Sequence, residues 1–283
     1  GRPTDRPLLA YVVETGDLLG VRWRPGSSGA ATGILEWLPE LVAFLREQGV
    51  EEITIRLDKG FPSKELVALL EELDVRFFLK MKNHKWVRRE LGSWRTSKRA
   101  DGIFGDAEAV VTNSGRLWGM RLLTLQGRRP LPEADETGDL LELDTWEVTN
   151  TCHILTNIPG IHALTAWRAY NRGALVEQRV KEMKQLSVGT TAVDDIDGNR
   201  LLWALGGLTY QLLHHLRRQL SGPARYMQPK TLRTRLFGGP AKFTDTGGQT
   251  EFQLPPSRGE DSLLLRLLEG LTGERDPPLA LAA

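Results

Sequence analysis

The first 82 residues alternate short β-like and α-like segments, and this order constrains the fold more than any other feature. Apolar residues recur with strand or helix periodicity, and turn residues separate the segments. The predicted order is strand (7–14), strand (18–24), helix (34–48), strand (52–57), helix capped by Ser63, and strand (75–81). The first two strands read as a hairpin. The last two are joined by a crossover helix, which makes them parallel, so we predict an α/β fold with a mixed sheet.

Asp58 stands directly after the strand at 52–57. Open α/β sheets bind their ligands at the carboxyl ends of their strands. This position makes Asp58 a candidate site residue.

A second candidate lies in the stretch from Ala169 to Lys184. Tyr170, Glu177 and Lys184 are spaced by seven residues, so they share one face if the whole stretch is a single helix. An apolar stripe runs beside that face, formed by Ala169, Val176, Val180 and Met183. The alternative is an ordinary amphipathic helix with solvated charges.

Residues 76–99 are strongly basic, with nine cations that include Lys85, Arg88 and Arg89 against the single acid Glu90. Tryptophans are interleaved with these cations. Such a stretch suits a phosphate backbone and base stacking. The alternative is a solvated helix face whose tryptophans lie in the core.

The middle and end of the chain differ in character. Residues 104–157 are β-like, and the strongly apolar segment 199–220 predicts a core helix. From 214 to 244 there are seven more cations and no acid. We therefore expect an inserted β-rich region, a packing helix and a second basic surface.

Composition and motifs exclude several classes of protein. The net charge is only +1, and the single cysteine, Cys152, predicts a reducing compartment, the cytoplasm. No apolar run approaches the length of about 18 residues that a membrane span needs. Phosphate-binding loops, zinc-ligand spacings and the G-x-S-x-G elbow are absent from the sequence.

After these exclusions, metal binding by carboxylates is the chemistry that the sequence still allows. Asp58 and Glu177 could jointly hold a hard divalent cation, because Mg²⁺ prefers carboxylate and water oxygens. With a third carboxylate they could hold two ions, one activating water or a 3′-hydroxyl and the other stabilising the leaving oxygen of a phosphodiester.

The element order, the segment RLDKGF around Asp58 and the stretch AYNRGALVEQRVKEMK resemble the catalytic domain of insertion-sequence DDE transposases. These have an RNase H-like fold, and one large group carries a Tyr-x-x-Arg-x-x-x-Glu-x-x-x-x-x-x-Lys signature. Tyr170, Glu177 and Lys184 match its spacing. The resemblance implies a mixed sheet with helices on both faces, an inserted β-rich subdomain, and metal-dependent DNA cleavage and strand transfer at transposon ends.

The resemblance also implies roles for individual residues. Asp58 and Glu177 would be the catalytic ligands of Mg²⁺ or Mn²⁺, and Tyr170 and Lys184 would position DNA phosphates. Trp118 or Trp146 would stack a base at the transposon end, or else pack the insertion onto the core. The implied partner is DNA, bound by a homodimer in the complex.

Two departures from the family pattern stand out. Gly173 occupies the signature arginine position, and the arginine stands at 172. Three alternatives follow: the role of this arginine at DNA phosphates is lost, a local bulge restores it to Arg172, or Lys181 substitutes. Only two strands precede the first helix, whereas RNase H-like sheets begin with three, the first carrying the first catalytic Asp. We therefore expect an N-terminally truncated catalytic domain. An inactive DNA-binding remnant and an RNase H-like nuclease remain alternatives.

The same comparison predicts four segments. They are a first part of the RNase H-like core (1–84), an inserted β-rich subdomain (85–158), the catalytic-Glu and packing helices (159–220), and a basic C-terminal region (221–283).

Overall fold

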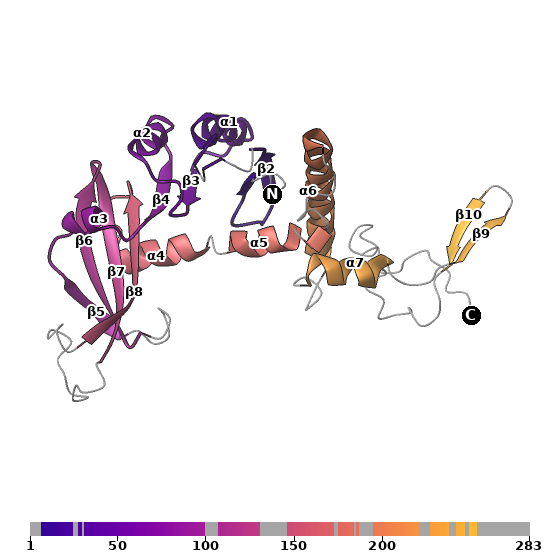
Figure 1. Ribbon diagram of the computed structural model, residues 1–283. Helices are drawn as coiled ribbons and strands as arrows, with labels where there is room; N and C mark the ends of the chain where they lie inside the picture. Colours follow the sequence, from indigo (N-terminus) through magenta and orange to yellow (C-terminus); the bar gives the residue numbers. More distant parts are fainter. Residues whose placement is uncertain are drawn as a thin grey trace. The chain divides into compact units, whose positions relative to one another are not determined.

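The computed structural model describes residues 7–24, 28–29, 31–99, 107–130, 146–172, 175–183, 185–186, 195–220, 227–237, 242–246 and 249–253. The chain divides into two compact units (Figure 1). The first spans residues 24–174, and the second combines residues 2–23 with 175–283. Each unit is described by itself.

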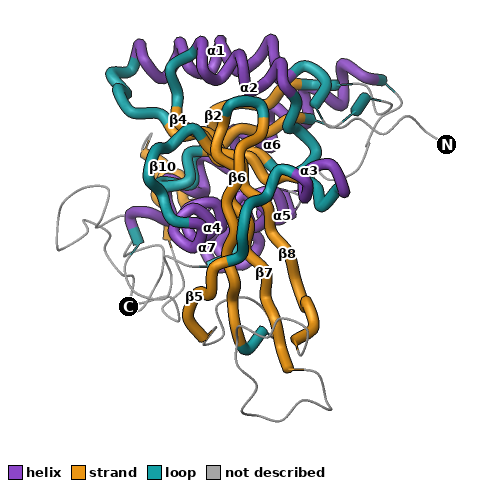
Figure 2. The backbone as a smooth tube through the Cα atoms, turned by 90° about the vertical axis from the view of Figure 1, so that its left-hand side faces the viewer, coloured by secondary structure: helices purple, strands orange, loops and turns teal. Residues whose placement is uncertain are grey.

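The first unit is built on a six-stranded sheet with the order β3-β4-β8-β7-β6-β5. Strands β3 and β4 are parallel, and every other neighbouring pair is antiparallel. Figure 2 shows β6, β7 and β8 as long strands side by side. The mixed α/β class is confirmed. The strands are β3 Thr54–Leu57, β4 Arg76–Met81, β5 Arg95–Arg99, β6 Ala109–Leu117, β7 Met120–Pro130 and β8 Trp146–Thr156.

The predicted helix at 34–48 and the predicted helix capped by Ser63 are both present in this unit. Its helices are α1 Ile34–Glu47, α2 Lys64–Glu72, α3 Lys85–Arg89 and α4 Ala163–Asn171. Ser63 caps α2, its Oγ accepting a hydrogen bond from the Leu66 N–H at 3.1 Å. Helix α2 is the crossover that makes β3 and β4 parallel.

The core lies on both faces of this sheet. Helix α4 packs its Ala163 and Ala166 against one face, where they meet a cluster that includes Phe78, Leu123, Leu125 and Ile154. Side chains alternate along a strand, so Phe77 and Leu79 point to the opposite face. Both are completely buried, so that face is covered as well.

The second unit holds the N-terminal hairpin and the last helices. Strands β1 (Leu8–Tyr11) and β2 (Leu18–Arg22) pair antiparallel, as predicted, and join no other strand among the residues described. The side-chain amide of Gln211 bridges the backbone N–H and C=O of Leu18 at 3.1 and 3.2 Å, and this fastens the hairpin to α6. The other elements are α5 Leu175–Met183, α6 Ile196–Gln219, α7 Pro229–Phe237, β9 Lys242–Thr246 and β10 Gln249–Gln253.

Three expectations about local structure are corrected. The predicted single helix from Ala169 to Lys184 is two helices, because α4 ends at Asn171 and α5 begins at Leu175. Gly173 lies between them, and glycine disfavours a helix interior by about 1 kcal/mol. The basic stretch contains a strand, β5, that its composition did not reveal.

The third correction concerns α6, which was expected in the core. Leu213 is buried, but five other leucines of the helix are 40–61% exposed. The four predicted segments stay a prediction, since the division into compact units follows other boundaries.

Candidate functional site

Asp58 is exposed directly after β3, at the carboxyl end of that strand. The Tyr170 hydroxyl, in the last turn of α4, donates a hydrogen bond to Asp58 Oδ1 at 3.3 Å. The Lys80 ammonium lies over the Tyr170 ring, 5.6 Å from its centroid. The structure therefore brings together two predicted site residues and adds a lysine that the sequence placed only in the basic stretch.

A hydrogen bond to the backbone next to Tyr170 fixes the position of this residue. Arg56, on β3, donates from Nε to the Ala169 carbonyl at 2.9 Å. This bond ties the C-terminal turn of α4 to the strand that ends at Asp58. The phenol is thus held beside the carboxylate by its own helix terminus.

Cys152 and His153 of β8 have structural rather than catalytic roles. Burial raises the pKa of the Cys152 thiol to about 11, with Lys80 acting in the opposite direction, so it stays protonated near neutral pH. His153 Nδ1 accepts from the Thr124 hydroxyl at 2.7 Å, and Nε2 donates to Asn83 Oδ1 at 3.2 Å. Burial, assisted by Arg88, lowers the pKa of His153 to about 4. A neutral histidine paired on both nitrogens holds strands in place.

Glu177 lies exposed in the first turn of α5, in the second unit. Its pairing with Asp58 stays a prediction. Arg172 is the exposed C-cap of α4, and Lys181 is exposed in the last turn of α5. Lys184 lies outside the described residues. Within the described ranges, no group of three or more His, Cys, Asp or Glu side chains could hold a metal ion.

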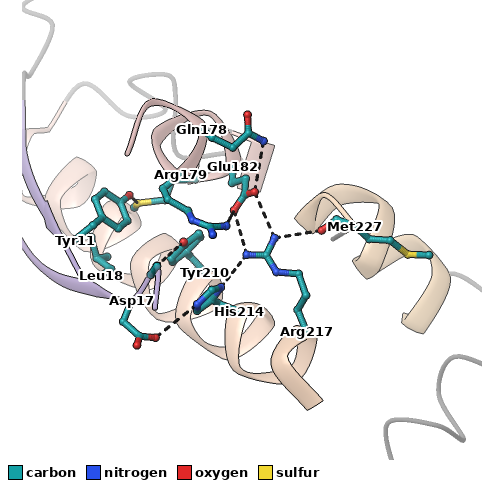
Figure 3. Close-up of polar contacts among 12 residues, drawn as sticks. Tyr11, Asp17, Leu18, Gln178, Arg179, Glu182, Tyr210, His214, Arg217 and Met227 are labelled. Carbon is teal, nitrogen blue, oxygen red and sulfur yellow. Dashed lines mark hydrogen bonds and ion pairs between the residues drawn. The ribbon is translucent and has the colours of Figure 1, made fainter. Parts of the chain in front are cut away.

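Sequence reasoning missed Glu182, which is 2% exposed on the same helix as Glu177. Its carboxylate pairs with Arg179 at 2.9 Å and with Arg217 of α6 at 3.3 Å (Figure 3). In a periodicity pattern it looks like one more solvated charge. Its position beside Met183 at the apolar edge was the only signal in the sequence.

The Glu182 cluster extends to the hairpin. Arg217 also donates to the Met227 carbonyl at 3.2 Å and to His214 Nδ1 at 2.8 Å. His214 Nε2 in turn donates to the Thr15 carbonyl at 2.7 Å, and burial lowers the pKa of His214. Helix α5, which carries Glu177, is thereby joined through Glu182 to α6, to the segment before α7 and to the β1–β2 turn.

The basic stretch forms an exposed surface on the first unit. Lys85, Arg88 and Arg89 of α3 are all exposed. Trp86, on the same helix, is 44% exposed, and its ring lies 5.9 Å from that of Trp118. The side chain of Trp146, the other predicted stacking residue, lies outside the described residues.

Trp118 occupies an unusual backbone position. It begins the tight turn between β6 and β7 with φ 51°, followed by Gly119 at φ 81°. A bulky residue in this left-handed region is strained. Both tryptophans line a cavity of about 710 Å³, whose lining also holds two cations, Lys64 and Arg116, and two acids, Glu71 and Glu90.

Together these features are consistent with the RNase H-like DDE class of proteins: a mixed sheet, an exposed aspartate at a strand end, and an exposed glutamate on a helix after the β-rich region. Residues 143–275, slightly less than half of the chain, match the family model described as transposase DDE domain, group 1. The matched segment includes Tyr170, Glu177 and Lys184, and it leaves out Asp58.

This match confirms the resemblance at the level of a DDE transposase and supports a transposase function with DNA as the partner. It does not confirm the group with the Tyr-Arg-Glu-Lys signature. No curated protein matches the chain. In the part of the chain that the structure describes, no helix is long and apolar enough to cross a membrane.

Proposed function

We propose that this chain is the catalytic domain of a DDE transposase, which cleaves DNA and transfers strands at transposon ends with a divalent metal. The observation that carries the proposal is the exposed Asp58 at the end of β3, oriented by Tyr170, in a chain whose Glu177 segment matches a DDE domain. The described site supplies the type of donor that Mg²⁺ prefers, an accessible carboxylate oxygen.

In this proposal Asp58 and Glu177 hold Mg²⁺ or Mn²⁺. Such an ion would activate the attacking hydroxyl and stabilise the leaving oxygen of the phosphodiester. The other roles belong to the chain itself. Tyr170 orients the Asp58 carboxylate and, with Lys184, positions DNA phosphates. Arg172 and Lys181 supply cations where the signature arginine is replaced by Gly173.

DNA would also contact the surface formed by α3 and the β6–β7 turn. Lys85, Arg88 and Arg89 neutralise backbone phosphates, and Trp118 offers a ring on which a base can stack. The strained backbone of Trp118 and its contact with Trp86 support this role. In the DNA complex we expect a homodimer.

Metal binding tests the carboxylates without requiring turnover. The bound fraction of Mn²⁺, measured by electron paramagnetic resonance, should fall at least about tenfold in Asp58→Asn and in Glu177→Gln, since each removes a charged oxygen ligand. Glu36→Gln, an exposed acid in the first turn of α1, is the matched control. Unchanged Mn²⁺ binding by Asp58→Asn would refute its assignment as a ligand.

DNA binding tests the basic surface. Affinity should fall steeply with salt, and Arg88→Ala or Arg89→Ala should each reduce the slope of log K against log salt by about 1. Arg200→Ala, which removes an exposed cation of α6, should leave the slope unchanged. A flat salt dependence in the parent protein would rule out these residues as backbone contacts.

The same assays identify the first alternative, and a strand-joining assay identifies the second. An inactive DNA-binding remnant would show the salt dependence, but its Mn²⁺ binding would not respond to Asp58→Asn or Glu177→Gln. An RNase H-like nuclease would bind metal through both residues and cleave DNA, yet it would join no strands.

A further inference from the structure

Lys80 lies beside Asp58 across the parallel pair of strands β3 and β4. The register of this pair sets Leu57 opposite Leu79. The next residues along the two chains, Asp58 and Lys80, therefore come at the same level of the sheet. Lys80 is two residues beyond Phe78, whose side chain packs with α4. Side chains two residues apart on a strand share a face, so Lys80 points to the face of the sheet that α4 covers.

The Tyr170 ring holds the Lys80 ammonium close to the Asp58 carboxylate. Lys80 Nζ lies over this ring, 5.6 Å from its centroid. The hydroxyl of the same ring donates to Asp58 Oδ1 at 3.3 Å. A cation over an aromatic face is stabilised by about 0.5–1 kcal/mol at an exposed site, and by more where water is excluded. Because Lys80 is half-buried, the ring favours one position of an otherwise flexible side chain.

The Cys152 thiol is influenced by both of these charges. Burial is the main reason why the pKa of Cys152 is raised; Lys80 lowers this pKa, and Asp58 raises it. Both charges therefore lie within electrostatic reach of one buried thiol of the first unit. In the described part of the chain, no carboxylate forms an ion pair with Lys80. The charge of Lys80 is thus available to a ligand of opposite sign.

A cation held beside a proposed metal ligand suits a phosphodiester. Each phosphate of the DNA backbone carries one negative charge, and lysine binds phosphate oxygens as a point charge. A phosphate bound by Lys80 would lie next to the Asp58 oxygens. There the ammonium can donate to a non-bridging oxygen and stabilise the negative charge that develops when the phosphodiester is attacked.

We infer that Lys80 binds the scissile phosphate of DNA at the candidate site, with the Tyr170 ring holding its ammonium in place. This inference rests on the proposed function and adds a substrate-binding residue to it. Lys80 lies outside both the signature stretch and the segment 143–275 that matches the family model.

The salt dependence of DNA binding tests the contact without requiring cleavage or metal. With a DNA duplex of mixed sequence, Lys80→Met should lower the slope of log K against log salt by about 1, because one phosphate contact is lost. Lys80→Arg keeps a cation and should keep the parent slope. Arg76→Met, which removes an exposed cation at the opposite end of β4, is the matched control and should also keep it. Circular dichroism verifies that each variant is folded.

The charge of Asp58 tests where the bound phosphate lies. In the metal-free protein its carboxylate repels a phosphate held by Lys80, so Asp58→Asn should strengthen DNA binding by about two- to fivefold. The gain should disappear when Lys80→Met is also present, because the phosphate is then no longer held beside residue 58. Glu36→Gln, at an exposed acid of α1, should leave the affinity unchanged with or without Lys80→Met.

Three outcomes would overturn the inference while leaving the proposed DNA binding intact. The first is a steep slope in the parent protein that Lys80→Met does not change. The second is a slope reduced equally by Lys80→Arg, which would show that the side chain matters for packing rather than for its charge. The third is a gain from Asp58→Asn that persists in the presence of Lys80→Met. A parent protein whose DNA binding does not depend on salt would contradict the proposed function, and this inference with it.

Discussion

Removal of the Glu182 carboxylate should destabilise the packing of α5 more than any other single charge change on that helix. Glu182 is 2% exposed and pairs with Arg179 at 2.9 Å and Arg217 at 3.3 Å. In Glu182→Ala the guanidinium of Arg217 remains buried without its counter-charge. Breaking a buried pair from one side costs about 3–5 kcal/mol. We expect about 3 kcal/mol, the lower end, because Arg217 keeps its bonds to Met227 and His214.

Amide hydrogen exchange measures this effect locally, which matters because the chain has two compact units. A loss of about 3 kcal/mol should speed exchange in α5 and in the facing part of α6 roughly 100-fold. Peptides from the first unit should exchange unchanged. Glu177→Ala is the control, since this exposed residue of the same helix should shift stability by no more than about 0.5 kcal/mol.

A much smaller change in exchange would contradict this role of Glu182. If exchange in α5 of Glu182→Ala stays within about threefold of the parent protein, the cluster does not hold the helix, and its ion pairs are worth no more than surface pairs. Glu182→Gln, which keeps a hydrogen-bond acceptor but no charge, should lie between the two.

Three further predictions concern the first unit. Folding lowers the pKa of His153 from 6.5 to about 4, so the unfolded chain takes up this proton first. The stability that neutral His153 contributes is present above about pH 6.5. It should fall by about 2–3 kcal/mol as the pH falls towards 4, as measured by urea titrations. The free energy of unfolding of His153→Gln should depend less on pH over this range. Ser63→Ala should cost about 1 kcal/mol, and Ser63→Asp should restore it, because either oxygen caps α2. An added Cβ at Gly115 would overlap the Glu90 carbonyl. Gly115→Ala should therefore lower the free energy of unfolding by more than about 2 kcal/mol. The control Ser114→Ala, at an exposed position, should change it by less than about 0.5 kcal/mol.

Local chemistry explains which parts of the fold could be predicted from sequence. Ser63 signals a helix start by itself, and the period-two pattern before Asp58 signals a strand, so both follow from neighbouring residues. The position of Asp58 at a sheet edge then follows from the crossover topology. No tertiary information enters these steps.

Contacts between distant residues could not be predicted in the same way. The bond from Tyr170 to Asp58 joins residues 112 positions apart, and it depends on how α4 packs on the sheet. Glu182 and Arg217 are 35 positions apart, and each alone resembles a solvated charge. The heptad spacing of Tyr170 and Glu177 predicted one shared helix face, but the two residues belong to separate helices, α4 and α5.

Helix α6 shows a different limit. Its leucines correctly predict a helix, but a helix apolar on two sides does not reveal which side its own unit buries. The buried side makes polar contacts with the hairpin, Tyr210 donating to the Gly16 carbonyl and Gln211 to the Leu18 carbonyl. Hydrophobicity alone therefore assigned the wrong leucines to the core.

The two proposed metal ligands, Asp58 and Glu177, lie in separate units, and in each unit another side chain of the chain holds the ligand's surroundings in place. Asp58 is exposed and is oriented by Tyr170, whose helix is tied back to β3. Glu177 is exposed on α5. Glu182, five residues further and therefore on another side of that helix, holds the helix through the partly exposed Arg179 and the buried Arg217. Each carboxylate thus has its own support. Tyr170→Phe should disturb metal binding through Asp58 without loosening α5, whereas Glu182→Gln should loosen α5 without altering the Asp58 side. If either variant disturbed both sites equally, the two supports would have to be parts of a single cooperative structure.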